Sequence, residues 1–214
     1  NGLMTLSCQE SNIAADSLLS LDREYMEALR ADNTWPTLFQ RGITQSLIKQ
    51  YTNSVNTLTT AIELNPSNPF LYLNRSTTRA EMIDFISSID NSYQRITIDS
   101  DPANRLNTNS KRTYSYDEAI ADLNKAAKLF PEFAHIYYNR ANLQALSGNL
   151  PEAFEDYTKA IELNPSFAEA YYNRGVVQIF MKDTRKGCLD LSKAGELGIT
   201  TAYDLLKRHA PVEN

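Results

Sequence analysis

An internal repeat of 34 residues constrains the fold of this chain more than any other feature of its sequence. The segment YYNRANLQAL, which begins at Tyr137, returns as YYNRGVVQIF at Tyr171, and Pro131 and Pro165 are separated by the same interval. Within each copy, apolar and small residues recur at spacings of three and four, with a polar break near residues 147–149. This spacing predicts two amphipathic helices per copy. Such a unit cannot bury its apolar faces alone, so neighbouring copies must stack and share one core.

The repeated residues resemble the signature of the tetratricopeptide repeat (TPR), in which aromatic, small and proline residues recur at set places. The unit at 134–167 meets this signature at Tyr137, Ala141, Ala153, Tyr157, Ala160 and Pro165. The unit at 168–199 meets it at Tyr171, Gly175, Gly187, Leu191 and Ala194, although Ile199 replaces the final proline. Small residues matter at these places because larger side chains would keep the paired helices apart. The YNRA and YNRG motifs resemble the repeat type common in bacterial TPR proteins.

The same frame extends over nearly the whole chain. The resemblance implies an all-α fold, a right-handed TPR superhelix of antiparallel helix pairs with a C-terminal capping helix and one long inserted segment. The expected divisions are 1–34, an N-terminal helix of a partial or degenerate repeat; 35–68, a TPR unit; 69–133, a TPR unit with an inserted segment at about 84–114; 134–167 and 168–199, two further units; and 200–214, a capping helix and tail.

The inserted segment follows from the positions of two prolines. Pro66 and Pro131 are 65 residues apart, which is 31 more than one repeat. Apolar residues continue at helical spacing beyond the place where the repeat should turn, so we predict a helix over residues 69–94 and a polar loop over 95–114. The side chains that would form its exposed apolar stripe, a candidate partner surface, are Met82, Phe85, Ile86, Ile89 and Tyr93. Either the chain folds back on this stripe through Ile96, Ile98 and Leu106, or a partner or second copy docks there.

TPR arrays use a concave groove, lined by the first helix of each pair, to hold peptides or helices of partner proteins. The resemblance places aromatic, amide and aliphatic side chains in this groove, and these are Phe39, Ile43, Leu73, Asn74, His135, Tyr138, Asn139, Asn142, Tyr172, Asn173, Val176 and Phe180. Asn74, Asn139 and Asn173 recur at one place and would form a ladder able to bind an extended backbone. The alternative is that repeat duplication carried them along and that they face solvent.

One known TPR mode, the clamp for the carboxylates of acidic chaperone tails, can be tested on the residues. Asn142 and Asn173 stand where the two asparagines of the clamp would be. The lysines and the arginine are missing, since Tyr138, Glu169 and Asn173 occupy places that need basic side chains in one unit or another. A partner with an acidic tail is therefore disfavoured, because its carboxylates would meet no fixed cation.

An arginine recurs one place after the amide, at Arg41, Arg75, Arg140 and Arg174. These arginines could form an anion-binding stripe, but aspartates recur on the second helices of the last three units. We therefore predict the structural ion pairs Arg75–Asp122, Arg140–Asp156 and Arg174–Asp190. Arg41 has Thr57 in place of the acid, so it is the member of the set expected to lack a partner.

Composition and charge exclude several classes of function. The chain has 214 residues and a net charge of −5, which disfavours a broad nucleic-acid surface, and its 7 glycines are too scattered for a phosphate-binding loop. The two histidines, His135 and His209, and the two cysteines, Cys8 and Cys188, are far apart in the sequence and suggest neither a metal site nor a nucleophile. We expect no enzyme activity, no cofactor and no metal. No apolar run approaches the roughly 20 residues that cross a bilayer.

The sequence thus favours a non-catalytic scaffold that binds a peptide or helix of an unidentified partner protein. The alternatives are an assembly module that self-associates through the helix at 69–94, as a homo-oligomer, and the targeting part of a larger protein. The chain begins at Asn1 rather than Met, so we expect a removed signal peptide or a piece of a longer protein. We expect a soluble protein, and the sequence leaves the cytoplasm and the periplasm open.

Overall fold

The computed structural model describes residues 15–31, 34–100 and 114–209. In these ranges the chain folds entirely into α-helices, as predicted. The helices are α1 (Ala15–Ala31), α2 (Trp35–Leu47), α3 (Tyr51–Leu64), α4 (Pro69–Ser100), α5 (Asp117–Leu129), α6 (Ala134–Leu146), α7 (Leu150–Leu163), α8 (Ala168–Phe180), α9 (Thr184–Glu196) and α10 (Ala202–His209).

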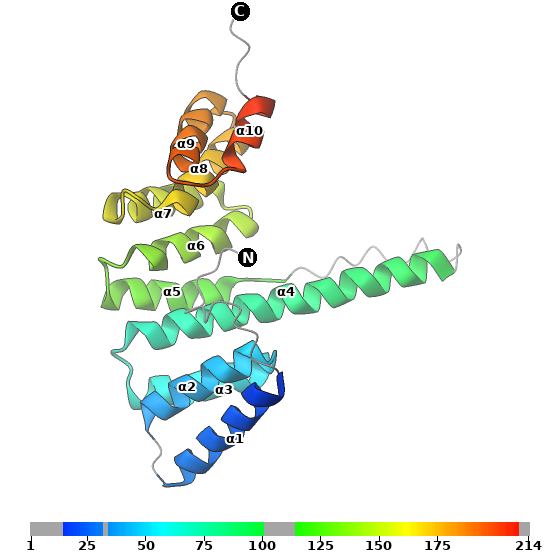
Figure 1. Ribbon diagram of the computed structural model, residues 1–214, viewed down its shortest axis with the longest axis vertical. Coiled ribbons are helices and arrows are strands. Elements are labelled where there is room, and N and C mark those ends of the chain that lie inside the picture. Colours follow the sequence, from blue (N-terminus) through cyan, green and yellow to red (C-terminus); the bar gives the residue numbers. More distant parts are fainter. Residues whose placement is uncertain (1–14, 32–33, 101–113, 210–214) are drawn as a thin grey trace, which may run out of the picture.

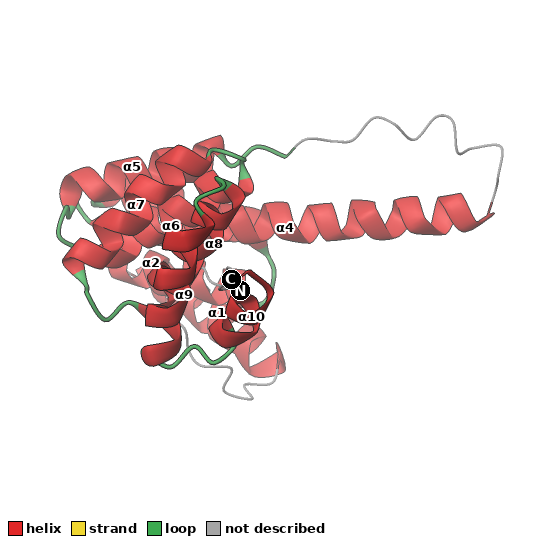
Figure 2. Ribbon diagram, turned by 90° about the horizontal axis from the view of Figure 1, so that it is seen from above, coloured by secondary structure: helices red, strands yellow, loops and turns green. Residues whose placement is uncertain are grey.

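Consecutive helices pack as antiparallel pairs, and the pairs stack along the long axis of the molecule (Figure 1). The pairs are α2–α3, α4–α5, α6–α7 and α8–α9, with α1 against α2 at one end and α10 against α9 at the other. Seen along the stack, α4 extends sideways well beyond its neighbours (Figure 2). The architecture therefore consists of stacked helix pairs with a single projecting helix among the described residues.

In each pair, two equivalent positions of the second helix are buried. One position carries a large side chain that is almost fully buried, namely Leu58, Leu123, Tyr157 and Leu191. The other carries an alanine with no exposed surface, namely Ala61, Ala126, Ala160 and Ala194. The large side chain supplies the buried apolar area and the alanine permits close approach of the neighbouring helix. This alternation explains why small and large residues recur in the sequence with the repeat.

In the last pair, α8 and α9 approach each other closely at Gly175 and Gly187. A Cβ added at Gly175 would lie 2.8 Å from the carbonyl oxygen of Gly187, and one added at Gly187 would lie 2.7 Å from that of Gly175. Because the obstacles are backbone atoms, neither position has room for a side chain. Alanine stands at the corresponding places in α6 and α7, where a small side chain is therefore accommodated.

Three of the first helices end in the same turn. Lys49, Gly148 and Lys182 follow α2, α6 and α8 with φ angles of 61°, 84° and 71°. In each turn the next residue donates its N–H to a carbonyl five residues earlier, as Gln50 does to Gln45 at 2.8 Å. This is the left-handed C-terminal cap that reverses the chain into the second helix.

The helix α4 has no such turn. The equivalent place is held by Ile83, whose branched Cβ is strongly disfavoured at positive φ, and the helix runs on to Ser100. We predicted a helix to residue 94 and a loop from 95, so the loop prediction was wrong for residues 95–100. These residues include no glycine or proline, whereas Pro102 disfavours the helical conformation at residue 101. The remainder of the predicted loop, including Leu106, lies mostly outside the described residues.

Candidate interaction groove

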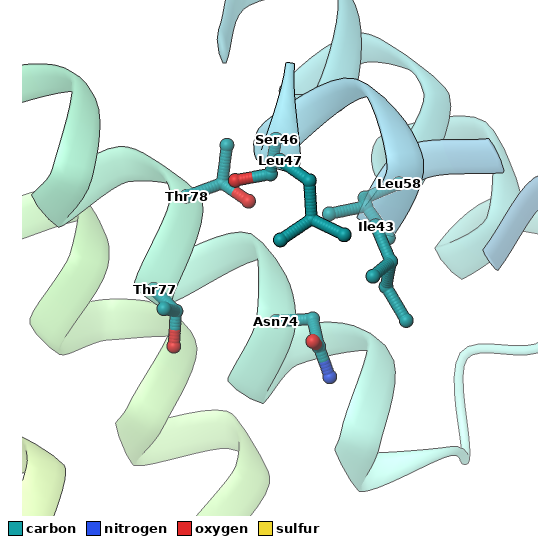
Figure 3. A pocket seen from close by; sticks show the side chains of 7 residues that line it. All are labelled: Ile43, Ser46, Leu47, Leu58, Asn74, Thr77 and Thr78. Atoms are coloured by element: carbon teal, nitrogen blue, oxygen red, sulfur yellow. The ribbon is translucent and has the colours of Figure 1, made fainter. Parts of the chain in front are cut away.

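A pocket that opens to solvent lies between α2 and α4 (Figure 3). Its walls are Ile43, Ser46, Leu47, Leu58, Asn74, Thr77 and Thr78. Asn74 donates its amide to the carbonyl of Phe70 at 2.9 Å, and Thr77 donates its hydroxyl to the carbonyl of Leu73 at 3.0 Å. The hydroxyl of Thr78 shares a hydrogen bond with that of Ser54, on α3, at 3.3 Å. These polar groups of the α4 wall are therefore already bonded within the protein.

Glu81 lies one turn beyond this pocket on α4. Ser46, which lines the pocket from α2, donates its hydroxyl to Oε2 of Glu81 at 2.8 Å. Burial raises the pKa of the Glu81 carboxyl, the bond from Ser46 lowers it, and the nearby charge of Asp84 raises it. The half-buried carboxylate therefore stands at the edge of an apolar surface in an environment that disfavours its charge.

The predicted asparagine ladder is not a uniform row. Asn173 is half-buried and donates to Oδ1 of Asn142 at 3.0 Å and to the hydroxyl of Tyr138 at 3.3 Å. Asn142 also accepts the hydroxyl of Tyr157 at 2.6 Å. Asn139, in contrast, is 1% exposed, and Asn74 is bonded to its own helix. The structure thus brings Asn142, Asn173 and Tyr138 together in one polar network between α6, α7 and α8.

A row of aromatic rings runs along the start of the first helices. The Phe133 ring lies 5.6 Å from the Phe70 ring and 5.0 Å from the imidazole of His135, measured between centroids. The row continues from His135 to Phe167 at 4.8 Å and from Phe167 to Tyr138 at 4.7 Å. Sequence reasoning missed Phe133 and Phe167, although their separation of one repeat length could have revealed them.

His135 is the titratable member of this row. Burial lowers the pKa of its imidazole, while the charge of Glu169 raises it. A neutral imidazole between two phenylalanine rings acts as a further flat packing surface rather than as a cation. The predicted groove residue is therefore part of the aromatic row.

The remaining predicted groove residues differ in exposure. Leu73 is buried, Phe39 packs against the core around α2 to α5, and Tyr172 and Val176 pack against the C-terminal cluster. Phe180 is 70% exposed at the end of α8, and Leu146 is 61% exposed at the same repeat position of α6. Leu47, at that position of α2, is 41% exposed and also lines the pocket. We call Leu47, Leu146 and Phe180 the apolar ridge.

The three arginines for which we predicted ion pairs lie against the aspartates named from the sequence. Each pair is bidentate, with both carboxylate oxygens accepting from one guanidinium. The distances are 2.9 and 2.6 Å for Arg75–Asp122, 2.7 and 2.6 Å for Arg140–Asp156, and 2.7 and 2.8 Å for Arg174–Asp190. In each case the aspartate is buried on the second helix of the same pair.

Each of these arginines also reaches the second helix of the preceding pair. The third guanidinium nitrogen donates to a side chain sixteen residues earlier, and the acceptors are Thr59 for Arg75, Asn124 for Arg140 and Thr158 for Arg174. A tyrosine ring three residues before each arginine lies 5.4 to 5.9 Å from its guanidinium carbon. The arginine thus joins three helices, and its charge is used inside the stack.

Arg41 does have a partner, so that part of our expectation was wrong. Its Nε donates to Oδ1 of Asp22 on α1 at 2.9 Å. Thr57 instead donates to Oε1 of Gln45 at 2.8 Å. The repeat frame could not show this pair because α1 precedes the first recognisable unit and supplies the acid from a different register.

The projecting part of α4 is anchored at its base. The ring of Tyr51, on α3, lies 5.7 Å from that of Phe85, and the hydroxyl of Tyr116 donates to Oδ1 of Asp84 at 2.8 Å. Burial, together with this bond to the carboxylate, raises the pKa of Tyr116 to about 12. Of the predicted partner surface, Met82 is half-buried while Phe85 and Ile86 are 40% and 38% exposed. The side chains of Ile89 and Tyr93 lie outside the described residues.

The described residues contain no cluster of three His, Cys, Asp or Glu side chains that could hold a metal ion. Cys188 is half-buried with a free thiol, and His209 is exposed on α10. No helix in the described ranges combines the length and the apolar character that a membrane span requires.

The comparisons with known proteins agree with this architecture. The TPR repeat model matches residues 145–179, from the end of α6 into α8. No curated protein matches the chain. A crystal structure of MamA is similar with a TM-score of 0.66 at 19% identity, covering 94% of this chain and 99% of that one.

Two further solved structures have the same fold. One is MamA from residue 41 to its end, from Desulfovibrio magneticus RS-1, with a TM-score of 0.66 at 17% identity and 85% coverage of both chains. The other is the first TPR of Spaghetti (RPAP3) bound to the HSP90 peptide SRMEEVD, with a TM-score of 0.52 at 18% identity, covering 70% of this chain and 94% of that one. The chain therefore has an all-α fold like that of solved TPR proteins, and one segment of it, residues 145–179, matches the TPR repeat model.

Proposed function

We propose that this chain is a non-catalytic scaffold that binds a peptide or helix of a partner protein along the first helices α2, α4, α6 and α8. TPR domains are generally protein–protein interaction modules, and a stack of repeats supplies an extended surface for one long ligand. The observation that carries the proposal is that all four recurring arginines form ion pairs inside the stack. The predicted groove is therefore lined by aromatic, amide and aliphatic side chains rather than by free cations.

The apolar ridge supports this proposal. Its three members occupy one repeat position, yet each exposes at least 41% of its surface rather than entering a core. Exposed apolar side chains that line up on one face of a protein are typical of interaction surfaces. Apolar side chains of a bound segment would cover the ridge, while Asn173 and its neighbours would meet polar backbone atoms.

The charge of the groove also favours some ligands over others. The Spaghetti TPR is bound to a peptide that ends in acidic residues, but the lining positions of the present chain hold no lysine or arginine. Asn142 and Asn173, which stand at two clamp positions, are bonded to each other. We therefore propose a ligand other than an acidic carboxyl-terminal tail. The YNRA and YNRG motifs support a bacterial type of repeat.

A peptide library screened against the whole chain tests this function. Phe180→Ser and Leu146→Ser each remove one exposed side chain of the ridge and leave every buried residue unchanged. We expect either change to weaken the selected peptides about tenfold, which is the size of a typical interface contact of roughly 1.4 kcal/mol. Leu189→Ser is a matched control, because Leu189 is 66% exposed on the second helix α9. If the control weakens binding as much as the ridge variants do, the groove is not the site.

Self-association through α4 is a second candidate, favoured by the exposure of Phe85 and Ile86 on the projecting helix. In this reading the chain acts as an assembly module, or as the part that targets a larger protein. Deleting residues 84–113 and measuring the molar mass by light scattering separates the candidates. A chain that is a monomer before and after the deletion does not assemble through this helix.

A further inference from the structure

Glu81 differs from every other buried or half-buried acid in the described ranges. The others are Asp22, Asp122, Asp156, Asp183 and Asp190, and each has an arginine or lysine partner. Within the same ranges, Glu81 has a hydrogen bond from Ser46 and no ion pair, and the charge that acts on it comes from another carboxylate, Asp84. Keeping a carboxylate half-buried without a cation costs free energy. The stack neutralises such groups everywhere else, so the missing cation at Glu81 is the anomaly to explain.

The surroundings of Glu81 define what kind of cation would fit. Thr77 and Thr78, which line the α2–α4 pocket, precede Glu81 by four and three residues and therefore share its helix face. Ser46 connects the two features directly, since it lines the pocket and donates to the carboxylate. Across the pocket, the side chains of Ile43, Leu47 and Leu58 form the apolar wall (Figure 3). An apolar wall near a carboxylate that has no ion-pair partner among the described residues matches an aliphatic stem that carries a terminal positive charge.

We propose that the α2–α4 pocket receives a lysine side chain of the partner segment, with its methylene stem against Ile43 and Leu47 and its ammonium on Glu81. The inference rests on the proposed function and names one ligand side chain that the groove selects. Charge complementarity carries it: the lining positions hold Glu81 and Glu169 and no lysine or arginine. The ammonium would also relieve the repulsion between the carboxylates of Glu81 and Asp84.

An NMR titration with n-butylammonium chloride tests the inference without knowledge of the partner. This probe reproduces the lysine side chain, and n-butanol at the same ionic strength is its uncharged counterpart. We expect saturable shifts of the backbone amides of Ser46, Thr77 and Thr78, with a dissociation constant about tenfold lower for butylammonium than for butanol. Equal affinity for the two probes would overturn the proposal, because the pocket would then recognise only the aliphatic stem.

Three variants make the result specific. Glu81→Gln keeps an acceptor for Ser46 and should remove the preference for butylammonium. Ser46→Ala removes that donor but keeps the carboxylate, so its preference should persist and would show that the charge rather than the local hydrogen bond is recognised. Glu169→Gln changes an exposed groove glutamate on α8 and should leave the preference unchanged. If Glu81→Gln, shown to be folded by cooperative thermal unfolding, still prefers butylammonium, Glu81 is not the cation site.

The titration and the peptide library can fail separately. A chain that selects peptides but does not distinguish butylammonium from butanol would keep the proposed function and lose this inference. A chain that distinguishes the probes but selects no peptide would keep the cation site and lose the proposed function. Shifts of the same amides on raising the protein concentration, without any probe, would identify a second copy as the occupant and overturn the assignment to a partner.

Discussion

The pairs α4–α5 and α6–α7 begin alike and then diverge. Both first helices place a tyrosine, an asparagine and an arginine at the same repeat positions, and both arginines pair with an aspartate on the second helix. After thirteen residues α6 reverses at Gly148, whereas α4 passes the same position at Ile83 and continues to Ser100. The pairing of the two helices therefore tolerates an insertion of 31 residues between them, because the contacts that join them lie away from the turn.

The two pairs also differ in the ion pairs that join their helices. Asp156 accepts from one guanidinium, that of Arg140, but Asp122 accepts from both Arg75 and Arg79. Arg79 further contacts Glu118 at 3.0 Å. The pair without a short turn thus has the more extensive ion-pair network, which holds α5 against α4 at the point where the chain returns from the insertion.

The largest predicted effect follows from this network. Asp122→Ala leaves two partly buried guanidiniums without their shared carboxylate, so we expect a loss of about 3–5 kcal/mol in the free energy of unfolding. Asp156→Ala removes the acid of a single arginine and should cost about 2–3 kcal/mol. Urea unfolding followed by circular dichroism measures both. A larger loss for Asp156→Ala would show that the second arginine adds nothing to the pair α4–α5.

A deletion tests the turn itself. Removing residues 84–114 restores the repeat spacing, and adding Ile83→Gly supplies a residue that accepts the left-handed conformation. The same deletion with Ile83 retained is the matched control, and it should be less stable by about 1–2 kcal/mol, the cost of a left-handed conformation for a residue with a Cβ. Equal unfolding free energies would show that residue 83 does not decide between a turn and a continuing helix.

Smaller effects are expected at the turns that already exist. Lys182 has a φ of 71°, so Lys182→Gly should relieve strain and stabilise the chain by about 0.5 kcal/mol. Gly148→Ala makes the opposite change at the equivalent position, where φ is 84°, and should destabilise by about 1 kcal/mol. Thermal unfolding of both variants checks the sign. Changes of the same sign would mean that the two turns are not equivalent.

The smallest effect concerns the dependence of stability on pH at Glu81. Burial raises the folded-state pKa of this carboxyl, so its contribution to stability is fully present below the unfolded pKa and is lost as the pH rises through the folded one. Glu81→Gln cannot ionise, and it should therefore gain stability relative to the unaltered chain between acidic and neutral pH. Urea unfolding at pH 4 and pH 7 measures the difference, and a relative loss at pH 7 would contradict the stated cause.

Much of the fold could be predicted from recurring residues. The helix pairs, the capping helix and the three arginine–aspartate pairs follow from the 34-residue frame, because residues in equivalent positions of a repeat meet equivalent neighbours. The partner of Arg41 could not be predicted in this way, since Asp22 belongs to a helix outside the clear repeats. The end of α4 was missed because a polar composition resembles a loop, even though nothing before Pro102 interrupts the backbone hydrogen bonds of a helix.

The positions of the groove residues could be predicted from the repeat, but their exposure and hydrogen bonds could not. Asn74, Asn139 and Asn173 are equivalent in the repeat, yet one bonds to its own helix, one is almost fully buried, and one bonds to the neighbouring asparagine and tyrosine. The residue before each asparagine also differs, because Leu73 precedes Asn74 whereas tyrosines precede Asn139 and Asn173. Equivalent positions therefore do not guarantee equivalent exposure to a ligand.

The sequence by itself determined the repeat, the helical fold and the three recurring arginine–aspartate pairs, because residues in equivalent positions of a repeat meet equivalent neighbours. Only the tertiary structure decided which side chains remain open to a partner. The pocket between α2 and α4, the exposed ridge and the position of Glu81, which has no ion-pair partner in the described ranges, arise from packing between units. Such packing depends on the size and charge of neighbours that lie one or more repeats away in the sequence.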